Sequence, residues 1–301
     1  MQALKLHPNL SGYLFGILFL SSLVGCGGGN SPSDLADTST PTENTTGLTG
    51  NGNSSGSSDS TPVPLVITPG AYLATLNGKE WVSFVFRTPQ GSGVNSHYLS
   101  LYYNSADPDI LSGSGLIAGA NTAVLSKAML FQNLLATVRV GNGSLTKPSE
   151  NALKVDLNFP ASGMELAKSI SVLVSSPTNY QYNLAPAQAS VQGTWQGRLS
   201  YGSGSSSSYT MVISAQGAVT SSLNFQQDCR ITQSSMRPNF DGTNLFAWNL
   251  TIPNATQCSF KNQLLTGAAF VTASPVAGKT QRLYAVAISP DGRGVSFKAD
   301  R

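Results

Sequence analysis

The sequence predicts an all-β protein, with two antiparallel β-barrel or sandwich-like domains after a disordered tether. From about residue 63 to the end, segments of strand length rich in β-branched and aromatic residues recur between turn signals. Several of these segments alternate apolar and polar residues, as strands with one solvated face do. The first 62 residues differ: a short apolar segment precedes a run rich in Gly, Ser and Thr.

The apolar segment has the features of an export signal. Residues 13–24 are too few to span a bilayer as a helix but fit the apolar part of a signal peptide. The segment ends in Leu23-Val24-Gly25-Cys26, which resembles the lipobox of bacterial lipoproteins. The resemblance implies removal of residues 1–25, lipid attachment at Cys26 and anchoring in the outer membrane. The alternatives are an ordinary secretory signal with a chance cysteine, or a short transmembrane anchor.

Residues 26–62 are expected to be a disordered tether. After Cys26 this stretch holds three clearly apolar side chains, four acids and no Lys or Arg. So little apolar surface cannot offset the entropy of ordering the chain. A flexible linker of this length spans roughly 30–40 Å. We therefore expect the folded body to begin near residue 63 and to stand clear of the membrane.

Within the body, strands are expected wherever apolar runs lie between turn signals. Ser289-Pro290-Asp291-Gly292 is such a turn, typical of a hairpin before a final strand. Residues 123–135 are the best helical candidate, with paired strands as the alternative. The expected strands are residues 81–87, 98–103, 153–159, 170–174, 194–201, 209–214, 245–252, 268–273, 283–289 and 294–298.

A faint internal repeat indicates two domains. Gly70-Ala71-Tyr72-Leu73 opens one half and Gly193-Thr194-Trp195-Gln196 opens the other. The similarity reflects either duplication or chance resemblance between β-rich sequences. Residues 177–189 look like the junction, so the predicted domains are residues 63–184 and 185–301.

Cysteine use agrees with export. Once Cys26 is acylated, only Cys229 and Cys258 remain, and an even pair in an oxidising compartment is expected to be bridged. The alternative is two separate buried thiols. Only one histidine, His97, follows residue 25, so we expect no metal site and no cofactor.

The sequence offers little for catalysis. His97 is interpreted as an exposed loop residue, and no Gly-x-Ser-x-Gly nucleophile elbow, P-loop, dinucleotide fingerprint or zinc motif is present. Residues 63–301 hold 16 Lys and Arg against 10 Asp and Glu, scattered singly. Without a basic run, and with export away from nucleic acids, nucleic-acid binding is not expected. We predict that the protein is not an enzyme.

Aromatic residues provide the candidate binding site. Trp81, Trp195 and Trp248 lie within expected strands, so core packing is favoured for them. The tyrosines expected to be partly exposed are next to an acidic turn, and together they form the predicted site: Tyr98, Tyr102, Tyr103, Asp107 and Asp109. The turn itself, Asp107-Pro108-Asp109, bears only a loose likeness to a calcium loop.

The layout of lipobox, tether and two β-domains is similar to that of two-domain β-barrel surface lipoproteins such as factor H binding protein. The resemblance covers layout alone, so no partner and no binding residue carries over from that family. We expect an envelope protein that binds a macromolecule, either a protein or a polysaccharide. The alternatives are an accessory lipoprotein of an outer-membrane assembly, and a hydrolase or hydrolase inhibitor acting on cell wall or glycans.

Overall fold

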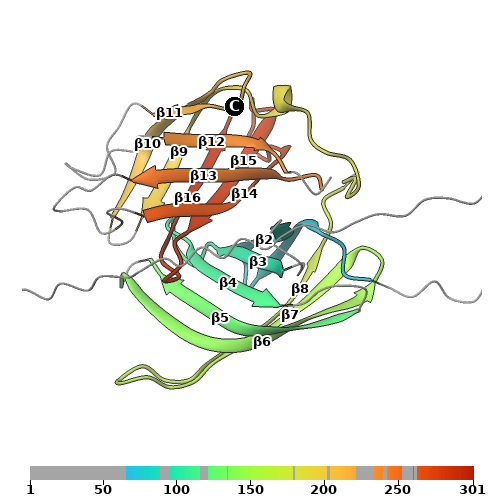
Figure 1. Cartoon of the computed structure of the whole chain (residues 1–301), viewed down its shortest axis with the longest axis vertical. Helices are drawn as coiled ribbons and strands as arrows, with labels where there is room; N and C mark the ends of the chain where they lie inside the picture. Colours follow the sequence, from blue (N-terminus) through green and yellow to red (C-terminus); the bar gives the residue numbers. More distant parts are fainter. Residues whose placement is uncertain are drawn as a thin grey trace, which may run out of the picture. The chain divides into compact units, whose positions relative to one another are not determined.

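The computed structural model describes residues 66–88, 95–115, 121–133, 135–178, 180–201, 204–221, 233–239, 243–252, 260 and 263–301. All of them belong to one compact unit, Ser60–Arg301. The described residues form sixteen β-strands in two antiparallel sheets and one short 3-10 helix, η1 (Gln188–Ser190) (Figure 1). The predicted all-β fold is confirmed. Within the described chain, no helix has the length and apolar character needed to cross a membrane.

The first sheet is a closed up-and-down barrel, in which each strand pairs with the next along the chain. Pairing of Leu73 in the first strand with Ser175 in the last closes it. Closure leaves no sheet edge exposed to other chains. The strands are β1 (Gly70–Leu76), β2 (Lys79–Thr88), β3 (Asn95–Tyr102), β4 (Asp109–Gly115), β5 (Thr122–Gln132), β6 (Thr137–Ser149), β7 (Ala152–Phe159) and β8 (Lys168–Ser175).

The second sheet is a barrel-like arrangement in the order β11-β10-β9-β16-β15-β14-β13-β12. Its two end strands approach each other, because Ala218 forms an isolated bridge with Ser235 and Met236 donates its N–H to Gly217 over 2.8 Å. The strands are β9 (Gly193–Tyr201), β10 (Gly204–Ile213), β11 (Val219–Ser221), β12 (Gln233–Pro238), β13 (Phe246–Ile252), β14 (Gln263–Ala273), β15 (Gln281–Ile288) and β16 (Gly294–Asp300).

The strand predictions hold, and the ambiguous segment 123–135 is resolved. Every segment expected to be a strand lies wholly or mostly within one. Residues 123–132 belong to β5, paired with β4 and β6, so the strand alternative is the correct one. Its buried and exposed residues alternate at the start, as expected for a barrel wall with one solvated face.

Each barrel encloses its own apolar core. Trp81 lies inside the first barrel and Trp195 and Trp248 inside the second, all with no exposed surface, as predicted.

The first strands of the two barrels share a local structure. Tyr72 Oη donates to the carbonyl of Thr68 over 2.6 Å, and Trp195 Nε1 donates to that of Val191 over 2.7 Å. In both cases the aromatic residue follows two positions after a glycine with positive φ and bonds four residues back, so the sequence repeat has a structural counterpart.

A third apolar core joins the outer walls of the two barrels. Val82 and Phe84 of β2 face outward from the first barrel, and Tyr284 and Val286 of β15 face outward from the second; all four are buried in this shared core. Alternate residues of the same strands, such as Trp81, fill the barrel interiors. β2 and β15 are therefore buried on both faces, which explains why each strand contains a nearly continuous run of apolar residues.

Charged and polar contacts reinforce this junction. Glu80 of β2 contacts Lys298, Tyr284 and Arg282 of the second barrel. Tyr180, in the segment between the barrels, accepts the N–H of Ala71 over 2.9 Å and donates to the carbonyl of Asn244 over 2.7 Å. The two barrels are thus held together by an apolar core and by several hydrogen bonds and ion pairs.

Candidate functional site

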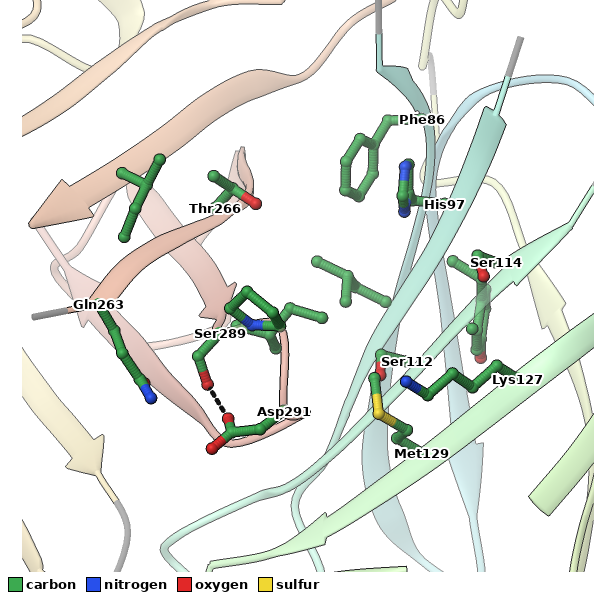
Figure 2. A pocket seen from close by; sticks show the side chains of 16 residues that line it. Phe86, His97, Ser112, Ser114, Lys127, Met129, Gln263, Thr266, Ser289 and Asp291 are labelled. Atoms are coloured by element: carbon green, nitrogen blue, oxygen red, sulfur yellow. Dashed lines mark hydrogen bonds between the residues drawn. The ribbon is translucent and has the colours of Figure 1, made fainter. Parts of the chain in front are cut away.

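A cleft of about 580 Å³ lies where the walls of the two barrels meet, and it is the candidate site (Figure 2). Strands β2 to β5 of the first barrel supply one side, and β14 with the end of β15 and the turn after it supply the other. The lining residues are Phe86, His97, Tyr98, Leu99, Ser112, Gly113, Ser114, Lys127, Met129, Gln263, Leu264, Thr266, Ile288, Ser289, Pro290 and Asp291. This volume is typical of a small-molecule site.

Strand alternation explains which side chains reach the cleft. Leu99 belongs to the outward-facing core between the barrels, whereas its neighbour Tyr98 belongs to the core inside the first barrel. His97 and Leu99 therefore project from the same face of β3. On β4, Leu111 points inward, which leaves Ser112 on the cleft side. The cleft is built on paired strands on both sides, so its walls are fixed by the sheets.

A β-bulge in β5 brings Lys127 to the cleft. Leu125 pairs with Gly143 and Ala128 with Gly141, so β5 holds one more residue than β6 between these pairs. Leu125 and Ala128 both point into the barrel, and the extra residue leaves Ser126 and Lys127 outside. Bulges commonly re-aim side chains next to functional sites. Here the bulge places a primary amine on a mostly apolar wall.

Three polar groups of the cleft have no bonding partner among the described residues. The Ser112 hydroxyl and the Gln263 side-chain oxygen are buried and make no hydrogen bond within that set. Lys127 is exposed and forms no ion pair with any described group. Asp291 differs, because Ser289 donates to it and Arg293 pairs with it at 2.7 Å. The uncompensated charge of the cleft is therefore positive.

His97 is a strand residue, and the interpretation as an exposed loop histidine is wrong. It pairs with Phe86 across β2 and β3, and the two rings stack with centroids 5.6 Å apart. The side chain is half-buried because the second barrel faces this wall. Burial lowers the pKa of the imidazole below its ordinary value and so favours its neutral form.

The expectation that Tyr98 and Tyr103 are partly exposed is also wrong. Tyr98 is inside the first barrel with no exposed surface, hydrogen-bonded to Ser83, and burial raises its pKa to about 12. Tyr103 lies in the core between the barrels. Only Tyr102 is half-buried, with its ring 5.3 Å from that of Trp81. The tyrosines form no exposed patch, because Tyr98 and Tyr102 pack in the interior of the first barrel and the second barrel covers Tyr103.

The two acids of the predicted patch take part in structural contacts. Asp107 accepts two hydrogen bonds from the Arg198 guanidinium, at 2.7 and 2.8 Å, and one from Ser200 at 2.6 Å. Asp109 lies 3.8 Å from the Lys168 amine, and burial raises the pKa of Asp109 despite that charge.

Within the part of the chain that is described, no three His, Cys, Asp or Glu side chains cluster closely enough to hold a metal ion.

The three cysteines, Cys26, Cys229 and Cys258, lie outside the described residues, so lipid attachment and the disulfide remain predictions. The strands that flank the latter two residues are informative: Gln233 pairs with Thr251, and Ile252 pairs with Gln263. Gln233, which begins β12, and Ile252, which ends β13, thus lie at the same end of the sheet.

No protein-family model, curated protein or solved structure matches this chain. The site must therefore be interpreted from its own chemistry.

Sequence reasoning missed the cleft, although a signal for it is present. The runs Trp81-Val82-Ser83-Phe84-Val85-Phe86 and Leu283-Tyr284-Ala285-Val286-Ala287-Ile288 do not alternate. Continuous apolar runs of this kind indicate strands covered on both faces. Each run ends in a residue that lines the cleft, Phe86 in one and Ile288 in the other.

Proposed function

We propose that this protein is a lipid-anchored envelope protein that binds a macromolecular partner without catalysis, and that the partner inserts an apolar group into the cleft between the barrels. Cys26 is the anchor, and the outer membrane is the proposed location. The observation that carries the proposal is the cleft itself, a mostly apolar hollow with a few polar groups on fixed walls. Binding sites commonly combine an apolar pocket with a small number of orienting polar groups.

The junction between the barrels favours a pre-formed cleft over a hinged one. The outer-wall core and the Asp107–Arg198 pair hold both sides of the cleft together. A pre-formed cleft binds at a smaller entropic cost than one that must be assembled around its ligand. The polar groups in it, Ser112, Gln263 and Lys127, can orient a ligand by hydrogen bonds and charge.

A capture experiment tests this function. The soluble chain of residues 27–301 contains all the described strands and lacks only the signal and Cys26. Immobilised on beads, it should retain a partner from detergent extracts of envelopes of the native cells and from the surrounding medium. Thr266→Trp, at an exposed position that lines the cleft, should abolish retention of that partner.

Thr220→Trp is the matched control, because Thr220 is also an exposed strand residue but does not line the cleft. It should leave capture unchanged. Equal capture by wild type and Thr266→Trp would show that the cleft is not the site.

The lipid anchor is tested separately. Cys26→Ser in intact cells should prevent incorporation of radiolabelled palmitate, and labelling of that variant would refute lipid attachment at Cys26.

A further inference from the structure

The walls of the cleft set the first requirement on its ligand. Apolar side chains from both barrels line it: Phe86, Leu99 and Met129 belong to the first barrel, and Leu264, Ile288 and Pro290 belong to the second. A chain or ring of hydrocarbon would bury apolar surface against each of them, at about 25 cal/mol per Å². A sugar or a nucleotide would leave most of its hydroxyl groups without partners there. The cleft thus favours a ligand whose body is apolar.

Charge sets the second requirement. Lys127 is the cation of the cleft, placed there by the bulge in β5, and it has no ion pair among the described residues. Asp291, the acid on the opposite wall, is already neutralised by Arg293 and accepts a hydrogen bond from Ser289. An anionic group would therefore meet one attractive charge and no free opposing one.

Unpartnered hydrogen-bonding groups set the third requirement. The Ser112 hydroxyl is buried, with 3% of the residue exposed, and has no partner in the described chain. Figure 2 shows the Lys127 amino group directed toward Ser112. A hydroxyl and an ammonium that converge can both donate to one carboxylate or phosphate. Gln263, across the cleft, offers a buried amide oxygen to a donor group.

We propose that the cleft binds an acyl chain that carries an adjacent anionic group, with the chain on the apolar walls and the anion on Lys127 and Ser112. This inference rests on the proposed function, because it names the group that the same cleft accepts. Two sources share this chemistry: an acylated, phosphorylated glycolipid of the envelope, which would itself be the partner, and a free fatty acid, which would occupy the cleft in place of the partner's apolar group.

Isothermal titration of the soluble chain (residues 27–301) with dodecanoate, kept below its micellar concentration, tests the proposal. One dodecanoate should bind per chain. Lys127→Met should weaken binding at least tenfold, whereas Lys79→Met should not change it. Lys79 is a matched control because it is an exposed lysine in the β1–β2 turn region and does not line the cleft. Dodecylammonium, with the same chain and the opposite charge, should bind at least tenfold more weakly than dodecanoate.

Ser112→Ala separates ligand recognition from folding. It removes a buried hydroxyl that has no partner in the described fold, so the variant should remain at least as stable as wild type while dodecanoate binds several-fold more weakly. Unchanged affinity in both Lys127→Met and Ser112→Ala would overturn the proposal, as would equal binding of dodecylammonium.

Failure of this inference can be told apart from failure of the proposed function. If dodecanoate does not bind but Thr266→Trp still abolishes capture of a macromolecule, the cleft is a binding site for a different group and only the acyl proposal is overturned. If dodecanoate binds as predicted, mass spectrometry of an organic extract of the protein from its own cells distinguishes the free acid from the phosphorylated glycolipid.

Discussion

Asp107 illustrates how single side chains join parts of the chain that are far apart in the sequence. It follows β3 in the first barrel, yet its carboxylate is held by Arg198 and Ser200 of β9 in the second. The Asp107 side chain is only 14% exposed, so water competes weakly for these bonds. The hydrogen bonds to Asp107 raise the pKa of Arg198 above its ordinary value. Asp107 therefore links the two barrels, and its predicted role in partner binding stays a prediction.

Asp107→Asn should lower the free energy of unfolding by about 2 kcal/mol, because it weakens a partly buried, doubly hydrogen-bonded ion pair. Urea denaturation of residues 27–301 measures the loss. Asp156→Asn is the control, since Asp156 pairs with Lys154 on an exposed wall. It should cost less than about 1 kcal/mol. A loss for Asp107→Asn no larger than that of the control would contradict the role given to this pair.

His97 should make stability depend on pH near neutrality. Burial lowers its pKa in the folded state, so the unfolded chain takes up a proton first as the pH falls below about 6.5. The stability that neutral His97 contributes is therefore present above that pH and is lost as the pH falls through the window below it. Because it is the only histidine in residues 27–301, His97→Gln should flatten the stability profile between pH 7.5 and 5.5. An unchanged slope in the variant would disprove the assignment.

At the scale of elements, alternation and turn signals predicted the strands well, because those signals are local. The buried positions of Trp81, Trp195 and Trp248 followed from the same signals. Which face of a strand points into a barrel, as at Tyr98, and what covers the other face, as at Tyr103, are not local properties, and so both residues were expected to be exposed. Pairs such as Asp107 with Arg198 depend on how two barrels pack, and neither spacing nor composition encodes that packing. The continuous run in β2 was the one available indication of a covered outer wall.

The disulfide is a prediction at this scale. The start of β12, four residues after Cys229, and the end of β13, six residues before Cys258, lie at the same end of the second sheet, as the pairing of Gln233 with Thr251 shows. A bridge would close a loop of about thirty residues and stabilise the fold by roughly 3–4 kcal/mol in the chain-entropy model. Cys229→Ala should lower the melting temperature, and thiol titration of the denatured, unreduced chain should find no free thiol. Two reactive thiols would disprove the bridge.

At the scale of the whole molecule, the core between the barrels determines whether they behave as one body. Val286 is fully buried in that core, on the outer wall of the second barrel. Val286→Asp would place an unpaired charge there without entering either barrel interior. It should convert a single thermal unfolding transition into two, as each barrel keeps its own core.

Val212→Asp is the matched control, because Val212 is 41% exposed on β10 and lies outside the shared core. It should retain the single transition. Calorimetry distinguishes the two results. One unshifted transition for Val286→Asp would show that the shared core does not couple the barrels.

Contact of the partner with the cleft between the barrels is tested most directly by site-specific photo-crosslinking in intact cells. A benzoylphenylalanine placed at Leu264, a 55% exposed residue that lines the cleft, should yield a covalent adduct with the partner. The same residue at Leu173, which is 58% exposed on β8 and does not line the cleft, should yield none. Adducts from Leu173 with none from Leu264 would contradict the account.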